Sequence, residues 1–285
     1  MRFAKAHGLG NDFILVAAAD GPSENVATWA QHLCDRHLGI GGDGVLLYGS
    51  APDGVTMRLV NADGSDGEVS GNGLRCLAGF AVAHGLAPAT HVVHTAPGPR
   101  PVRVERLGAG RYRIATDLGE PLLRSDRIPV ALEPPCPQVL DYDLQAAGRT
   151  VRITATSLGN PHCAVFLDSR PSDELFAALG PALMSHPFFP KRTNVEFVVV
   201  RERAQIEVRF WERGVGPTLA SGTGAASAAV ASILTGRADR KVRVVCDGGI
   251  LEVEWPEGGH VHQVGEVELL FEGEWLGDVA TAGLS

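Results

Sequence analysis

Two short segments combine a serine with closely spaced glycines: Ser70-Gly71-Asn72-Gly73 and Ser221-Gly222-Thr223-Gly224. An apolar run follows each segment, so each is predicted to open a helix. Glycines at a helix start leave backbone N–H groups uncovered, and the helix dipole adds about half a positive charge there. Such an end binds anions, often a carboxylate or a phosphate. A single Gly-x-Gly is more often only a tight strand-to-helix turn, so the inference depends on the second copy.

The two copies together indicate a specific chemistry. If each copy belongs to one of two domains that face each other, two helix N-termini converge on one cleft. Ser70 and Ser221 would then lie on opposite sides of a ligand. This arrangement suits a reaction that removes a proton from one face of a carbon and returns it to the other face. We therefore predict Ser70 and Ser221 as an acid–base pair.

Further polar residues recur in the two halves and could orient the ligand. Asn11 and Asn160 occupy equivalent turns, although turn chemistry alone also favours asparagine because it tolerates left-handed backbone. Asn61 corresponds to Glu212 (212 − 61 = 151), which Arg213 follows. A solvated ion pair is one interpretation of Glu212 and Arg213. We favour the other, in which Glu212 meets the amino group and Arg213 the carboxylate of a zwitterion.

An internal repeat underlies these pairs. Leu9-Gly10-Asn11-Asp12 recurs as Leu158-Gly159-Asn160-Pro161, at an offset of 149 (158 − 9), and the two serine segments lie 151 residues apart (221 − 70). The apolar patterns between these anchors also match. Several anchors at nearly one offset indicate a duplicated domain.

Both halves are predicted to contain the same series of elements. The predicted helices are 24–37 and 74–84 in the first half and 172–183 and 225–235 in the second, with Ser23 and Ser172 as N-caps. The predicted strands are 3–6, 13–17, 44–48 and 55–60, then 151–155, 163–167, 195–200 and 205–211. A closing hairpin region is predicted to end each half, at 102–116 in the first and at 242–254 and then 261–271 in the second. Strands wrapped around the apolar helix of each half would bury it on all sides.

The expected fold class is therefore α+β, with two pseudo-symmetric domains, each a β-sheet or barrel around a central helix. We expect domains at 1–120 and 121–271, joined near residues 118–150, a stretch rich in proline. A tail of about residues 272–285 could pack back on the first domain.

Composition excludes several classes of protein. The chain has 285 residues and a net charge of −8, which argues against binding to nucleic acid or to an anionic membrane surface. No apolar run approaches the length of a membrane span, and residues 1–13 lack the apolar segment of a secretory signal. The five cysteines show no zinc-ligand spacing, so we expect no metal site, no disulfides and a cytoplasmic protein.

The chain resembles the diaminopimelate epimerases, cofactor-independent enzymes that interconvert LL- and meso-diaminopimelate. The resemblance covers almost the whole chain, in the family's order. Its motifs are His7-Gly8-Leu9-Gly10-Asn11-Asp12-Phe13, Gly39-Ile40-Gly41-Gly42-Asp43-Gly44, Asn61-Ala62-Asp63-Gly64-Ser65, Gly71-Asn72-Gly73-Leu74-Arg75-Cys76, Gly159-Asn160-Pro161-His162, Thr193-Asn194, Glu212-Arg213-Gly214-Val215-Gly216 and Gly222-Thr223-Gly224-Ala225. It implies the epimerase fold, an amino-acid substrate, no metal or organic cofactor, and a homodimer with a contact near Phe271.

The resemblance also implies the site residues. The implied catalytic residues are Ser70, Ser221, His162 and Glu212, with His162 and Glu212 assisting the serines. Substrate contacts are implied at Asn11, Asn61, Gly71, Asn72, Asn160, Asn194, Glu212, Arg213, Gly222 and Thr223. A histidine within a core is more often ordinary packing, but the Gly-Asn-Pro-His context favours a functional role for His162.

The chain departs from the family at the catalytic pair. The family places cysteines at the positions of Ser70 and Ser221. A thiol has a pKa of about 8.5, whereas a serine hydroxyl is a far weaker acid and needs an adjacent base. Cys76 cannot substitute, because it lies about one and a half turns into the predicted helix.

Three interpretations are open. The chain is a natural variant whose serines still move the proton, a deliberate double replacement that traps the ligand, or an isomerase of the same fold with a different substrate. We favour the natural variant, because both serines fit the repeat. A protein that only binds the amino acid is the rival outside the enzyme classes.

Overall fold

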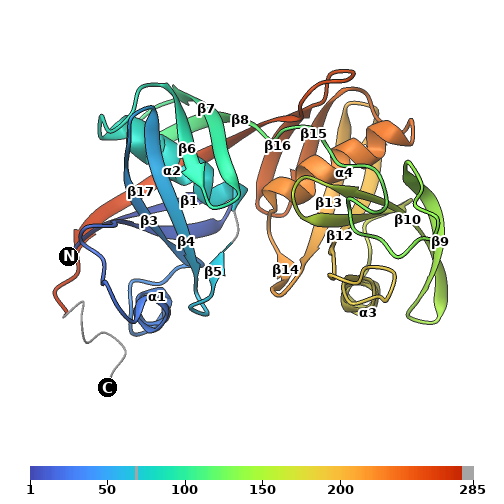
Figure 1. Cartoon of the computed structure of the whole chain (residues 1–285), viewed down its shortest axis with the longest axis horizontal. Coiled ribbons are helices and arrows are strands. Elements are labelled where there is room, and N and C mark those ends of the chain that lie inside the picture. The colour runs from blue at the N-terminus through green and yellow to red at the C-terminus, as the bar shows by residue number, and fades with distance from the viewer. Residues whose placement is uncertain (68–69, 278–285) are drawn as a thin grey trace. The chain divides into compact units, whose positions relative to one another are not determined.

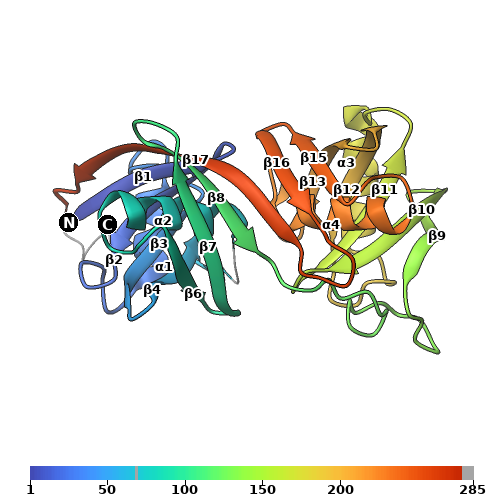
Figure 2. The same cartoon turned by 90° about the horizontal axis from the view of Figure 1, so that it is seen from above.

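The computed structural model describes residues 1–67 and 70–277. It divides into two compact units: unit 1 combines Met1–Thr116 with the segment that begins at Val264, and unit 2 is Asp117–Gln263. In both units, strands surround a helix (Figures 1 and 2). No helix within the described ranges is long and apolar enough to cross a membrane.

Unit 1 is a closed barrel around one helix. Its strands are β1 (Arg2–Gly8), β2 (Asn11–Ala17), β3 (Gly44–Ala51), β4 (Gly54–Asn61), β6 (Thr90–Thr95), β7 (Gly98–Arg106), β8 (Arg111–Asp117) and β17 (His262–Glu274). Pairing runs from β1 through β2, β3, β4, β6, β7 and β8 to β17, which pairs again with β1. The short strand β5 (Asp66–Gly67) pairs with β4.

The central helix of unit 1 is α2 (Gly71–Ala83), whose residues from Asn72 to Ala81 are all buried. Leu77 packs there with Phe13 and Leu46 from the surrounding strands. A helix that is buried on every face needs packing partners on every side, and the strands of the barrel supply them. Outside the barrel, helix α1 (Val26–Cys34) packs Trp29 and Leu33 against β3 and β4.

Unit 2 repeats this order of elements. Its strands are β9 (Val139–Ala146), β10 (Arg149–Ser157), β11 (Pro161–Leu167), β12 (Asn194–Glu202), β13 (Gln205–Glu212), β14 (Gly216–Thr218), β15 (Lys241–Cys246) and β16 (Gly249–Glu254), with helices α3 (Asp173–Met184) and α4 (Gly222–Leu234). Helix α4 is buried among the strands, and the parallel pairs β11–β12 and β13–β15 correspond to β2–β3 and β4–β6. The predicted α+β fold is thereby confirmed.

Several predicted helix starts differ from the structure. Helices α2 and α4 begin at Gly71 and Gly222, three residues before the predicted starts, because the preceding serines cap them. Ser172 caps α3 as predicted, with its Oγ accepting a hydrogen bond from Leu175 N at 3.3 Å. The prediction of Ser23 as a cap was wrong: Asn25 precedes α1, in left-handed backbone with φ 57° and without a side-chain cap bond.

The unit boundaries differ from the expected positions in two places. Residues 139–146, expected within the connecting stretch, form β9 and pair with β10. Residues 264–271 group with unit 1, because β17 pairs with β1, for example Phe271 with Lys5. Of the tail expected to return to the first domain, 272–274 pair with β1, and 278–285 lie outside the described residues.

Candidate functional site

The two predicted catalytic serines are both helix N-caps. Ser221 has extended backbone (φ −133°, ψ 126°), and its Oγ accepts a hydrogen bond from Gly224 N at 3.2 Å. A Cβ at Gly224 would lie 2.9 Å from that Oγ, so only glycine permits this close approach. Ser70 caps α2 in the same way, with its Oγ accepting from Gly73 N at 3.1 Å. A serine is thus favoured here by helix capping alone.

The Ser221 hydroxyl also interacts with the carboxylate of Glu212, the last residue of β13. Burial raises the pKa of Glu212, while hydrogen bonding from Ser221 and the nearby His162 act in the opposite direction. A carboxylate beside a hydroxyl can accept its proton and so activate it as a base. Across residues 1–67 and 70–277, no carboxylate or imidazole is found hydrogen-bonded to Ser70. Among the described residues, the two serines therefore differ in the groups that contact their hydroxyls.

His162 is fully buried near the start of β11. Its Nε2 lies 3.0 Å from Asn160 Oδ1, and Asn160 Nδ2 donates to Thr223 Oγ1 at 3.4 Å. Thr223 belongs to the first turn of α4, so a chain of polar contacts connects the buried histidine with the helix N-terminus. His162 therefore has hydrogen-bonding partners among the predicted site residues, beyond apolar packing.

Asn194 and Arg213 lie beside this chain. Asn194 begins β12 and is in register with His162 on β11. Its Oδ1 accepts a hydrogen bond from Arg213 N at 2.8 Å, and Arg213 Nη1 donates to Lys191 O at 3.1 Å. Unit 2 thus brings together a set of predicted site residues: Asn160, His162, Asn194, Glu212, Arg213, Ser221, Gly222 and Thr223.

Unit 1 brings together a second set. Asn11 Nδ2 donates to Asp43 Oδ2 at 2.6 Å, and Asn72 Nδ2 donates to Asn11 Oδ1 at 3.3 Å. Asn72 follows Ser70 and Gly71 at the start of α2. Asn61 pairs with Gly44, the residue after Asp43, and its own Nδ2 donates to Ser65 Oγ at 2.9 Å. Asn61 is therefore next to the Asn11–Asp43 contact but is not linked to it by a described hydrogen bond.

Sequence reasoning missed the charged groups behind these residues. In unit 1, Asp12 contacts Lys5 Nζ at 2.6 Å and Arg36 at 2.7 Å, and Arg36 also contacts Asp43. In unit 2, Glu196 lies 2.7 Å from His162 Nδ1 with both side chains buried. The available signal was a charged residue within an otherwise apolar strand, because buried charges are almost always paired.

The buried cysteines do not offer an alternative acid–base group. Burial raises the pKa of Cys76, within α2, to about 12. Burial likewise raises the pKa of Cys163, next to His162 on β11, well above its usual range. A thiolate is the reactive form of cysteine, so both side chains are inert near neutral pH.

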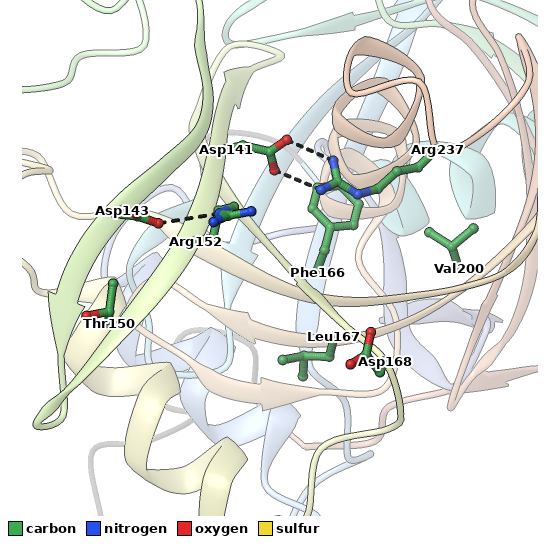
Figure 3. Close-up of a pocket in the computed structure, with 9 residues that line it drawn as sticks. All are labelled: Asp141, Asp143, Thr150, Arg152, Phe166, Leu167, Asp168, Val200 and Arg237. Atoms are coloured by element: carbon green, nitrogen blue, oxygen red, sulfur yellow. Dashed lines mark hydrogen bonds and ion pairs between the residues drawn. The ribbon is translucent and has the colours of Figure 1, made fainter.

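A surface groove of about 700 Å³ lies elsewhere in unit 2 (Figure 3). Four of its charged side chains form ion pairs: Arg237 contacts Asp141 at 2.9 Å, and Arg152 contacts Asp143 at 3.4 Å. None of the predicted site residues lines it. Within the described ranges, no group of three or more His, Cys, Asp or Glu side chains is arranged to hold a metal ion.

The chain matches a known protein family and relatives over nearly its whole length. Residues 3–123 and 154–270 match the family model for diaminopimelate epimerase. A diaminopimelate epimerase of Pelotomaculum thermopropionicum is 44% identical over 285 residues, covering 96% of this chain and 99% of the relative. Another, from a Synechocystis strain, is 43% identical over 279 residues, covering 96% and 98%.

Solved structures with low sequence identity share the fold. One is a predicted epimerase from Pseudomonas aeruginosa, with 18% identity, a TM-score of 0.69, and coverage of 97% of this chain and 99% of that chain. Another is a hydroxyproline epimerase from Agrobacterium vitis, with 14% identity, a TM-score of 0.67, and coverage of 96% and 90%. Given the family match and the close full-length relatives, the chain belongs to the diaminopimelate epimerase family.

Proposed function

We propose that this protein is an amino-acid epimerase that interconverts LL- and meso-diaminopimelate without a cofactor. Family membership supports the substrate and the reaction. The observation that carries the chemistry is the contact between the Ser221 hydroxyl and the Glu212 carboxylate at the N-terminus of α4. A hydroxyl with a carboxylate behind it can exchange a proton with the substrate.

In the proposed step, Ser221 Oγ takes the proton from the α-carbon while its own proton passes to the Glu212 carboxylate. The electron pair of the broken C–H bond stays on the substrate as a carbanion, and its charge spreads into the adjacent carboxylate. The backbone N–H groups at the helix N-termini stabilise this negative charge.

A proton from Ser70 then adds to the opposite face of the α-carbon and completes the inversion. Both serines and Glu212 return to their starting protonation states by exchange with water. The reverse reaction uses the same groups in exchanged roles, because inversion always removes the proton from one face of the carbon and adds it to the other.

The remaining predicted residues hold the substrate. Arg213 is assigned to the carboxylate of the distal amino-acid end, which does not react, because a guanidinium can pair with a carboxylate through two hydrogen bonds. Its backbone N–H donates to Asn194 Oδ1. Asn11, Asn61, Asn160 and Asn194 are assigned to polar contacts with the substrate, as are Asn72 and Thr223 and the first glycines of the two helices, Gly71 and Gly222.

The function is tested by incubating the protein with LL-diaminopimelate in deuterated water. We expect meso product with one deuterium at the inverted α-carbon. Mass spectrometry detects the deuterium, and chiral chromatography separates the stereoisomers. Binding in calorimetry without deuterium incorporation would instead identify a protein that only binds the amino acid. Deuterium exchange with another amino acid but not with diaminopimelate would identify a different epimerase.

We also propose a homodimer in the cytoplasm. Leu270 and Phe271 on β17 are 45% and 53% exposed, and the family resemblance implies a dimer contact near Phe271. Light scattering should report twice the chain mass, with Phe271→Glu lowering it and Leu107→Glu, at another exposed leucine, leaving it unchanged. The five free cysteines agree with a reducing compartment.

A further inference from the structure

Arg75 is a buried arginine to which the proposed reaction gives no role. It lies on α2 and is 1% exposed. Its Nη2 donates a hydrogen bond to Asn72 Oδ1, one turn earlier on the same helix, because helical side chains tilt toward the helix N-terminus. The helix dipole disfavours a positive charge at that end. The stability of α2 alone therefore does not explain an arginine at this position.

The guanidinium fixes the orientation of the Asn72 amide. Arginine carries five N–H donors and no acceptor, so the amide atom that faces it must be the oxygen. This leaves the amide nitrogen for the other neighbour, and Asn72 Nδ2 donates to Asn11 Oδ1 at 3.3 Å. Arg75 thus begins a series of hydrogen bonds that passes from α2 to Asn11 at the start of β2.

Asp43 ends this series. Its Oδ2 accepts from Asn11 Nδ2 at 2.6 Å and from Asp12 N at 3.0 Å, and its Oδ1 accepts from Arg36 at 2.8 Å. Backbone N–H groups and guanidinium groups only donate, so Asp43 is an acceptor at both oxygens. Every bond in the series from Arg75 to Asp43 therefore runs in one direction, from a group that only donates to a group that accepts.

Unit 2 has alanine in place of the arginine, and the direction there is the opposite one. Ala226 stands where the repeat places Arg75 (226 − 75 = 151), and Thr223 stands where it places Asn72. The turn asparagine of unit 2, Asn160, donates from Nδ2 to Thr223 Oγ1 at 3.4 Å. In unit 1 the corresponding asparagine accepts from the helix residue instead. The direction of this bond thus differs between the units together with the residue at the arginine position.

We propose that Arg75 is a positioning residue that fixes the amide of Asn72 and, through it, the amide of Asn11. Each amide uses one N–H in the series and keeps a second N–H in an orientation set by Arg75 and Asp43. Because Asn11 and Asn72 are assigned to substrate contacts, this inference rests in its kinetic part on the proposed function. The orientation of the two amides does not depend on that function and can be measured without substrate.

The first measurement is hydrogen exchange at the side-chain amides of Asn72 and Asn11, followed by ¹⁵N NMR and assigned with Asn72→Ala and Asn11→Ala samples. In the unmodified protein we expect slow exchange at both, since each donates a hydrogen bond. Arg75→Met keeps the aliphatic part of the side chain but removes the donors. Exchange at both amides should then become about tenfold faster, the effect of one lost hydrogen bond. Arg75→Lys keeps a cationic donor group and should be intermediate.

Two comparisons separate positioning from general loosening. Arg103→Met makes the same change at an exposed arginine on β7 and should leave both amides unchanged. In an Asn72→Ala background the series is broken, so adding Arg75→Met should not affect the Asn11 amide further. A further effect there, or an unchanged Asn11 amide in Arg75→Met alone, would overturn the proposal. Fast exchange at the Asn72 amide of the unmodified protein would also overturn it, and this result requires no variant to fold.

Kinetics with LL-diaminopimelate provide the second measurement. Arg75→Met should raise KM about tenfold with a smaller change in kcat, because it loosens contacts made in the ground state and the transition state alike. Arg75→Lys should restore part of the affinity, and Arg103→Met should change neither constant. If the amides respond as expected but the protein shows no deuterium exchange, the role of Arg75 stands and the epimerase function is refuted. An active protein whose amides do not respond would refute the role of Arg75 alone.

Discussion

Ser221 has two hydrogen-bonding functions at one atom. Its Oγ accepts from Gly224 N as a helix cap, and its side chain also interacts with the Glu212 carboxylate, which counteracts the effect of burial on the pKa of Glu212. Ser70 shares the cap but has no carboxylate or imidazole bonded to it within the described ranges. Within residues 1–67 and 70–277, a carboxylate is therefore found beside Ser221 but not beside Ser70.

Replacing both serines by cysteine should raise the epimerisation rate by orders of magnitude. A thiolate is accessible near neutral pH, whereas an alkoxide is not. Ser70→Cys or Ser221→Cys alone should help less, because inversion needs an acid and a base together, so the double change should exceed the product of the single ones. Deuterium incorporation into LL-diaminopimelate measures this. A folded double variant that binds diaminopimelate but shows no α-proton exchange would mean that the pair is not catalytic.

Arg213→Ala should weaken diaminopimelate binding severely, by several kcal/mol. A substrate carboxylate would lose its charged partner on desolvation. The backbone N–H of residue 213 still donates to Asn194 in this variant, so the loss reports on the guanidinium alone. Titration calorimetry measures the affinity, with Arg203→Ala, at an exposed arginine paired with Asp239, as the control. Unchanged affinity of Arg213→Ala would show that the guanidinium does not contact the substrate.

At the element scale, an ionic cluster connects the strands that carry Asn11. Asp12 on β2 contacts Lys5 on β1 and Arg36 in the segment after α1, and Arg36 also contacts Asp43 before β3. Burial alone would raise the pKa of Asp12, but hydrogen bonds and charges from Arg36 and Lys5 outweigh it and lower the pKa to about 2. The cluster thus stabilises β1 and β2 and, through Asp43, the Asn11 amide.

Asp12→Asn should destabilise the protein by about 2 kcal/mol at pH 7, from the lowered pKa of Asp12. A depressed carboxyl pKa stabilises the folded state above the unfolded value of 3.8, and this contribution is lost as the pH falls through about 2. The difference between variant and unmodified protein should therefore shrink below pH 3.8. Urea unfolding at several pH values measures it. Asp66→Asn, at an exposed ion pair, should have little effect. A destabilisation that is the same at pH 7 and pH 2.5 would contradict the assigned pKa.

At the scale of the whole molecule, unit 1 is assembled from two distant parts of the chain. Strand β17 comes from the C-terminal part and pairs with β1 and β8, so it closes the barrel around α2. Unit 2, by contrast, is one continuous segment, Asp117–Gln263. The two units therefore depend differently on the end of the chain.

A chain that ends at Gln263 should retain unit 2 and lose the ordered barrel of unit 1. Without β17, the facing edges of β1 and β8 lose their partners, and the apolar core around α2 is open to water. Hydrogen exchange should show fast exchange in β1 and β8 but protected amides in α4 and β12. A chain that ends at Gly277 keeps β17 and should resemble the full chain. Protected β1 amides in the shorter chain would refute this dependence.

Local patterns in the sequence were enough to predict several features of the fold and of the candidate site. The repeat offset predicted two units of one fold, and the paired Ser-Gly-x-Gly segments located the N-termini of both central helices. Apolar alternation located most strands, and the motifs identified the residues now found together in unit 2. These features follow from periodicity, turn chemistry and helix capping, all of which act over a few residues.

The contacts between residues that are distant in the sequence became known only from the folded chain. Ser23 and Asn25 differ little as cap signals, and packing of α1 on β3 and β4 selects the helix start. Residues 264–271 join unit 1 because the barrel needs a strand between β8 and β1. The partners of Asp12 and of Glu196 could not be predicted, because a buried charge requires compensation but nothing local specifies which residue supplies it. The register between strands places these charged side chains next to their partners, and that register depends on the packing of the whole sheet.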